Sequence, residues 1–151
     1  VLLGIGEPSE FVAGDSCSLF GKANTWQSLT PFVPTRHPKN HRDGRPKLDA
    51  DGWYIGSPEH DLRRLILERR DLPPPLKIER RRTIEVSGRS LRCVQFQLRR
   101  NHGNGLRGDG LGYSFRVLFP SAVTGPLAFG YGAHFGLGLF GVGQSSYVPS
   151  G

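Results

Sequence analysis

The stretch Tyr113-Ser-Phe-Arg-Val-Leu-Phe119 decides the fold class of this chain. Its aromatic and aliphatic residues alternate with Ser114, Arg116 and Leu118 along the sequence. A period of two residues is typical of a β-strand that buries one face and exposes the other. The sequence therefore predicts a strand here, and with it a sheet.

Four further strands are predicted on either side of this stretch. Residues 94–98 alternate in the same way, and residues 76–86 keep Leu76, Ile78, Ile84 and Val86 on one parity, although arginines interrupt it. Residues 25–34 are rich in aromatic and β-branched side chains and are stopped by prolines. A short last strand is expected around residues 137–142.

A single helix is predicted to begin at Ser57-Pro58-Glu59. Serine is a good N-cap, proline suits the first turn, and an acidic residue favours the positive end of the helix dipole. Leu62, Leu65 and Ile66 then form an apolar stripe at helical spacing. Prolines 73–75 prevent the helix from continuing.

These elements predict an α+β fold with a ferredoxin-like (RRM-like) antiparallel sheet, one main helix and a C-terminal glycine-rich loop. The second helix of that fold would be reduced to a turn near residues 125–129. We divide the chain into an irregular N-terminal segment (1–24), the ferredoxin-like domain (25–143) and a C-terminal tail (144–151). The chain begins with Val1 and contains no Met, so we expect it to be a piece of a longer protein.

Composition favours an anionic partner. Twenty Lys and Arg residues against 13 Asp and Glu give a formal charge of +7, which suits nucleic acid but is also compatible with a merely solvated basic surface. Two distant cysteines make no zinc pattern and no disulfide framework, and no apolar run is long enough for a membrane span. We therefore expect a cytoplasmic protein with no metal and no cofactor.

A cationic loop follows the first predicted strand at residues 35–51. It contains Arg36, Lys39, Arg42, Arg45 and Lys47. Loops of this length in a compact domain are often functional. His37 lies between two of these cations, which should disfavour its protonation and suit it as a base, with His41 in reserve; a solvated loop histidine is the alternative.

The C-terminal region alternates glycine with large apolar residues from Gly130 to Gly143. It matches neither a dinucleotide fingerprint nor a P-loop. Glycine allows close backbone approach, and its N–H groups can point at phosphates. The candidate RNA contacts are therefore Gly130, Tyr131, Gly132, Gly136 and Gly138. A glycine-kinked strand packed on the core is the alternative.

Two stretches together resemble a known family. They are Trp26-Gln-Ser-Leu-Thr-Pro-Phe-Val-Pro-Thr-Arg-His-Pro-Lys39 and Gly125-Pro-Leu-Ala-Phe-Gly-Tyr-Gly-Ala-His-Phe-Gly-Leu-Gly-Leu-Phe140. The pair resembles the CRISPR-associated RAMP superfamily, in particular the repeat-processing endoribonuclease domain of the type I-U (I-G) fused backbone and processing protein. The resemblance covers about residues 25 to 143.

The resemblance implies binding of CRISPR repeat RNA and its metal-independent cleavage to mature crRNA. The ribose 2′-OH would attack the adjacent phosphorus and leave a 2′,3′-cyclic phosphate. His37 would be the base, His134 the acid or an RNA contact, and Arg36 and Lys39 would stabilise the developing charge, with Arg42 as a further RNA contact. Other subunits of a type I CRISPR effector complex are implied as partners.

Two other functions remain open on the sequence. One is a non-catalytic RAMP-type domain that only holds the crRNA within the effector complex, and the other is an ordinary cellular RNA-binding domain. A further basic feature is the run Arg80–Arg82, which is usually a solvated face. Together with Arg89, Arg92, Arg99 and Arg100 it would form an RNA track on the sheet.

Overall fold

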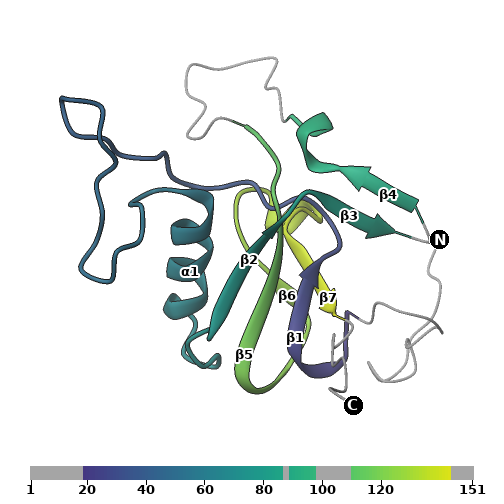
Figure 1. Ribbon diagram of the computed structural model, residues 1–151. Helices are drawn as coiled ribbons and strands as arrows, with labels where there is room; N and C mark the ends of the chain where they lie inside the picture. The colour runs from purple at the N-terminus through teal and green to yellow at the C-terminus, as the bar shows by residue number, and fades with distance from the viewer. Residues whose placement is uncertain (1–18, 87–88, 98–109, 144–151) are drawn as a thin grey trace, which may run out of the picture.

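A five-stranded antiparallel sheet and one α-helix make up the centre of the molecule (Figure 1). The computed structural model describes residues 19–86, 89–97 and 110–143. The sheet has the order β2-β5-β1-β7-β6, and each pair of neighbours is antiparallel. Its strands are β1 (Lys22–Ser28), β2 (Lys77–Arg81), β5 (Ser114–Thr124), β6 (Leu127–Ala128) and β7 (Leu139–Val142).

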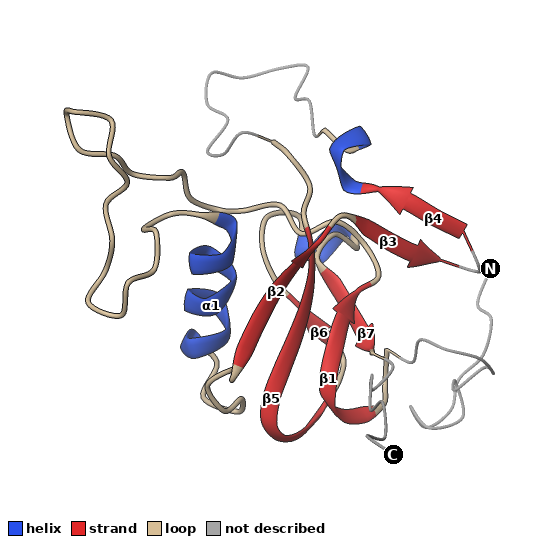
Figure 2. Cartoon of the chain, viewed as in Figure 1, coloured by secondary structure: helices blue, strands red, loops and turns tan. Residues whose placement is uncertain are grey.

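The chain leaves β1, passes through helix α1 (Pro58–Glu68) and returns as β2, with β5 lying between the two strands. After β5, the chain returns to the far side of β1 as β7. This α+β arrangement confirms the predicted fold class, and its strand order is compatible with a ferredoxin-like fold. Figure 2 shows α1 standing beside the β2 edge of the sheet.

The alternation in β5 builds the core. Phe115, Val117 and Phe119 are buried, whereas Arg116 and Leu118 between them are only partly buried. The buried ring of Trp26 belongs to the same core cluster. The predicted period of two in this strand is therefore confirmed. Full burial of an aromatic side chain is worth about 1.5–3 kcal/mol, so these residues contribute substantially to the stability of the fold.

Helix α1 forms where the sequence predicts it. The hydroxyl of Ser57 accepts a hydrogen bond from the amide of His60 at 3.2 Å, and Pro58 occupies the first turn. Leu62 and Ile66 are buried in the core cluster, and Leu65 packs against it from a partly buried position. The apolar stripe therefore docks the helix on the sheet.

The predicted strand at residues 94–98 is wrong. Residues Cys93–Gln95 form a single 3-10 turn instead, in which the amide of Phe96 donates to the carbonyl of Cys93 at 3.0 Å. The strand of this region is β4 (Arg89–Arg92), which pairs with β3 (Thr83–Val86) in a separate two-stranded hairpin. The chain leaves the sheet at Arg82, which explains why the parity of residues 76–86 is interrupted there.

The boundaries of the first strand and of the expected turn also differ from the prediction. Strand β1 begins at Lys22, inside the segment expected to be irregular, and ends at Ser28. Residues 29–34 stay beside the sheet because Phe32 forms a backbone bridge with Tyr113. The region 125–129 contains the two-residue strand β6, and the helical turn lies later, at Ala133–Phe135 (η3).

Some expectations fall outside the described residues. They concern Arg99, Arg100, most of the segment 1–24 and the tail 144–151. Within the described part of the chain, α1 is far too short to cross a bilayer, and no other helix is long and apolar enough to do so.

Candidate functional site

The two stretches that carry the family resemblance lie side by side. The amide of Tyr131 donates to the carbonyl of Val33, and the amide of Gly138 donates to the carbonyl of Pro31, each at 2.8 Å. The hydroxyl of Thr30 joins them again, because it donates to the carbonyl of Gly136 at 2.7 Å. The glycine-rich segment is therefore paired with the chain directly downstream of β1.

Close backbone approach explains two of the candidate glycines. A Cβ at Gly138 would lie 1.8 Å from the carbonyl oxygen of Phe129, and a Cβ at Gly130 would lie 2.6 Å from the carbonyl oxygen of Val33. The backbone that approaches these glycines belongs to the protein itself. These two glycines therefore fit the alternative in which the glycine-rich segment packs against the core of the protein.

Many amides of this segment already have acceptors within the protein. Those of Tyr131, Phe135, Gly136, Leu137 and Gly138 donate to backbone carbonyls. These five N–H groups are therefore not free to point at phosphates. Any contact with an anionic ligand through them would require the turn to open, so side chains are better placed to make it.

The turn η3 presents side chains to solvent. Gly132 and Gly136 flank it, both in the left-handed region with φ of 75° and 86°. The turn between them exposes His134 and leaves Phe135 with 92% of its surface accessible. Tyr131, just before the turn, is also exposed. Two aromatic side chains and a histidine thus stand on one short segment.

A buried carboxylate positions the start of the cationic loop. Asp61 of α1 is fully buried and accepts hydrogen bonds from the amide of Thr35 at 2.6 Å and from its hydroxyl at 2.9 Å. Arg64 pairs with the same carboxylate at 2.8 Å. The residue before Arg36 is therefore tied to the helix, and the guanidinium of Arg36 projects from a fixed point.

The backbone of His37 is held as well. A Cβ at Gly56 would lie 1.9 Å from the carbonyl oxygen of His37, so the two backbones are in close contact at the start of α1. Gly56 has a φ of +79° and donates its amide to the Nδ1 atom of His60 at 3.2 Å. His60 thus has a structural role, and His37 is exposed beside the helix.

Residues 39–55, which we call the arm, project from the body of the molecule beside α1 (Figure 1). Three backbone hydrogen bonds of 2.9 Å close a ring at its root. Lys39 donates to Ile55, Ile55 donates to Lys47, and Lys47 donates to Lys39. The cationic loop predicted from the sequence is thus an ordered unit of two lobes, one on either side of Lys47.

Most of the predicted cations on and before the arm are exposed. Only Arg45 has an ion-pair partner, Asp43, at 2.7 Å. In the part of the chain that the structure describes, no carboxylate pairs with the other four, which are Arg36, Lys39, Arg42 and Lys47. Their charges are therefore available to a ligand.

The chain matches no known protein family, no curated protein and no solved structure.

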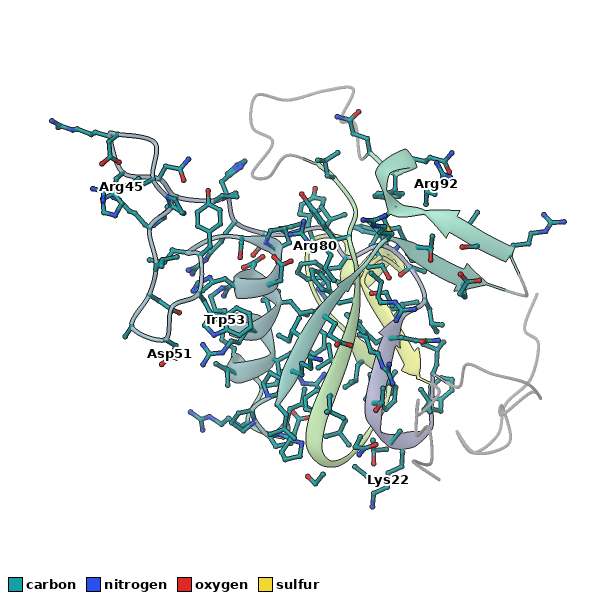
Figure 3. All side chains as sticks on the ribbon, viewed as in Figure 1. Lys22, Arg45, Asp51, Trp53, Arg80 and Arg92 are labelled. Atoms are coloured by element: carbon teal, nitrogen blue, oxygen red, sulfur yellow. The ribbon has the colours of Figure 1, made fainter. Side chains whose placement is uncertain are left out.

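A cleft of about 690 Å³ opens between the arm and the body, lined among others by Trp53, Tyr54, Glu59, Arg80 and Tyr113. The guanidinium of Arg80 makes two hydrogen bonds to Glu59, at 2.6 and 2.8 Å, and lies 4.8 Å from the ring centroid of Tyr113. Figure 3 shows Arg80 at the centre of this end of the molecule, with Trp53 on the arm side.

The arginine track predicted on the sheet is divided between two units. Arg80 and Arg81 belong to β2 at the edge of the sheet, whereas Arg89 and Arg92 belong to the hairpin strand β4. Arg82 connects the two units. The track is therefore only partly on the sheet, because the chain leaves it after β2.

Sequence reasoning missed two features of the site. Asp61 lies in the first turn of α1, where the sequence indicates only a favourable charge for the helix start, yet its main partners are Thr35 and Arg64. Trp53 and Tyr54 give no periodic signal because they lie in the arm, outside any helix or strand. In the described residues, no three His, Cys, Asp or Glu side chains gather as a metal site would require.

Proposed function

We propose that this chain is a RAMP-type domain of ferredoxin-like fold that binds CRISPR repeat RNA and cleaves it without a metal ion. The observation that carries the proposal is the pairing of residues 30–33 with residues 130–139. This pairing brings together the two stretches on which the family resemblance rests. His37 lies four residues after Val33. His134 lies three residues after Tyr131, whose amide donates to the carbonyl of Val33.

The reaction follows from the two histidines and the fixed cations. Neutral His37 removes the proton of a ribose 2′-OH, and the 2′ oxygen attacks the adjacent phosphorus. The bond from phosphorus to the 5′ oxygen breaks, and His134 delivers a proton to that leaving oxygen. The products are a 2′,3′-cyclic phosphate and a 5′-OH end, and each positioned acid or base supplies about 10²–10⁴-fold in rate.

Arg36 and Lys39 stabilise the charge that develops on the phosphorane. Arg36 follows the anchored Thr35, and the backbone of Lys39 belongs to the ring at the root of the arm. Cations that leave a backbone held in place need less reorganisation during the reaction, which lowers the barrier. Arg42 and Lys47 extend the cationic surface along the arm for the RNA backbone.

One observation favours a second candidate function, in which the domain holds crRNA without cutting it. The exposed rings of Tyr131 and Phe135 lie on the glycine-rich segment beside His134. Aromatic side chains in such positions stack on unpaired bases and add affinity without chemistry. In either case the partners are crRNA and the other subunits of a type I effector complex in the cytoplasm.

A cleavage assay tests the proposal and separates the candidates. End-labelled CRISPR repeat RNA is incubated with the protein in EDTA, and the products are examined for a 2′,3′-cyclic phosphate. We expect cleavage at one position. Tight binding without cleavage would support the crRNA-holding domain, and equal affinity for repeat and unrelated RNA would remove the CRISPR assignment.

A further inference from the structure

A second cleft, of about 620 Å³, lies next to the first and shares Arg80 and Tyr113 with it. Its walls come from the end of β2, the hairpin and the segment before β5. The lining residues are Arg80, Arg81, Arg82, Thr83, Arg92, Cys93, Leu111, Gly112 and Tyr113. We call it the arginine cleft, because four of its nine lining residues are arginines.

The arginine cleft carries uncompensated positive charge. None of its lining residues is acidic. The charge of Arg80 is offset by Glu59, and Arg81 interacts with Glu79. Arg82 and Arg92 have no ion-pair partner within residues 19–86, 89–97 and 110–143. Two exposed guanidinium groups thus line this cavity without a counter-charge, and both are available to an anion.

Backbone pairing holds these two arginines close together. The amide of Cys93 donates to the carbonyl of Arg82 at 3.1 Å, and Arg92 is paired with Thr83 across the hairpin. Arg82 and Arg92 therefore leave neighbouring points of the backbone. Guanidinium forks in such an arrangement match the oxygens of a phosphate group.

The rest of the wall is apolar. Leu111 is exposed, and Tyr113 lines the same cleft. Burial raises the pKa of the Cys93 thiol, while a hydrogen bond with Ser114 acts in the opposite direction, so the sulfur stays neutral at physiological pH. A volume of this size is typical of a site for one small organic molecule.

We infer that the arginine cleft binds one unpaired nucleotide of the RNA, with its phosphate on Arg82 and Arg92 and its base against Leu111 and Tyr113. The inference rests on the proposed function for the identity of the strand. An acidic peptide would satisfy the arginines but not the apolar wall, and a duplex would not fit a cavity of this size. The cleft is thus a second contact point, separate from the histidines.

The cleft is structurally connected to the first site. Tyr113 exchanges two backbone hydrogen bonds of 2.8 Å with Phe32, which lies in the stretch that pairs with the glycine-rich segment. In Figure 3, Arg80 lies between Arg92 on one side and the arm with Arg45 on the other. A strand of RNA that passes the histidines can therefore continue across Tyr113 into the arginine cleft.

Salt-dependent binding tests the inference. The probe is a fluorescent CRISPR repeat RNA with 2′-O-methyl riboses, which lacks the attacking hydroxyl and stays intact. Removing the single phosphate contact with the double variant Arg82→Gln and Arg92→Gln should reduce the magnitude of the slope of log K against log salt by about 0.7. The matched control is Lys22→Gln with Arg70→Gln, which removes two exposed charges at the other end of the sheet (Figure 3 labels Lys22).

Equal slopes for the cleft variant and the wild type would overturn the inference. A second variant, Leu111→Glu, places a carboxylate in the wall and should weaken binding although no arginine is removed. If a glutamate-rich peptide binds the wild type and fails to bind the cleft variant, while RNA binding is unchanged, the cleft is a protein-docking site and the inference is wrong. The unmodified repeat distinguishes the two proposals: if wild-type protein leaves it uncut while the cleft variant still lowers the salt slope, only the proposed cleavage is contradicted.

Discussion

Arg36 shows how a single exposed residue receives a defined position. Its neighbours on both sides are held against α1, Thr35 through Asp61 and His37 through the backbone contact with Gly56. The guanidinium itself has no ion-pair partner in the described part of the chain. Its starting point is therefore fixed by the backbone, while its charge remains free for a ligand.

Asp61→Ala should destabilise the fold by about 3 kcal/mol, because it removes a buried partner and leaves the amide of Thr35 without its acceptor. The matched control is Glu68→Ala, which removes the exposed carboxylate that pairs with the same Arg64 and should cost less than about 1 kcal/mol. Urea denaturation measures both values. Equal losses would show that Asp61 has no special role in anchoring the loop.

His37→Ala should abolish repeat cleavage and leave repeat affinity within a few-fold, because a base contributes mainly to the transition state. His134→Ala is the comparison, since it removes the other exposed histidine of the two paired stretches. Single-turnover kinetics measure the cleavage rate, and fluorescence anisotropy measures the affinity for the repeat. If only His134→Ala stops the reaction, the base lies in the glycine-rich segment, and if both variants cut at the wild-type rate, neither histidine acts.

At the scale of elements, the glycine-rich segment contains two nearby glycines that are required for different physical reasons. Gly138 is required by a neighbouring backbone, since a Cβ there would lie 1.8 Å from the oxygen of Phe129. Gly136 has open space around it and is required only by its φ of 86°. The two positions therefore separate the effect of packing from the effect of backbone conformation.

Gly138→Ala should cost about 3 kcal/mol or more, because the added methyl group meets backbone that cannot move aside. Gly136→Ala should cost only about 1 kcal/mol, the usual penalty of a left-handed alanine. Thermal or urea unfolding compares them. A Gly136→Asn variant, which tolerates this conformation, should keep both the stability and the RNA affinity, and a loss of affinity at unchanged stability would show that RNA approaches the backbone at Gly136.

The elements predicted correctly are those whose signal is local. The N-cap at Ser57 and the stripe of Leu62 and Ile66 are determined within one helix, and the alternation of residues 113–119 within one strand. The strand predicted at residues 94–98 failed because the same alternation is compatible with a turn once β3 and β4 pair with each other. The order of strands could be proposed only by analogy.

The candidate site was predictable where residues are close in sequence and unpredictable where the fold brings them together. The cations of residues 36–47 were identified as a group, and four of them are exposed without an ion-pair partner in the described chain. The role of Asp61 was not visible, because its partner Thr35 lies on a different element. The arginine cleft likewise depends on pairing between Arg82 and Cys93.

For the whole molecule, the exposed cations of the arm and of the arginine cleft lie at one end of the sheet. The arm leaves from this end, and the hairpin with Arg92 leaves from the same end on the other side (Figure 3). Six cations without an ion-pair partner in the described chain therefore lie near the two paired stretches and both clefts. Long-range attraction of a polyanion toward this end follows.

RNA binding should depend strongly on salt. Four cations before or on the arm and the one phosphate held in the arginine cleft make about five contacts, which predict a slope of log K against log salt of about −3.5 for single-stranded RNA. Replacing the four cations of the first group with Gln should leave about −0.7. Anisotropy titrations over a range of salt concentrations measure both slopes. A flat response of the wild type would exclude an electrostatic mode of binding.

The backbone hydrogen bonds among Lys39, Lys47 and Ile55 hold the root of the arm together, and the two lobes lie outside this ring. Each lobe begins and ends at the ring, so insertions or exchanges within residues 41–46 or 48–53 leave the root and the neighbouring His37 in place. The entropic cost of lengthening such a closed loop grows only slowly with its length. The first lobe can therefore change in length or sequence without disturbing the domain, whereas the second lobe must keep its contact with α1, where Asp51 pairs with Arg63.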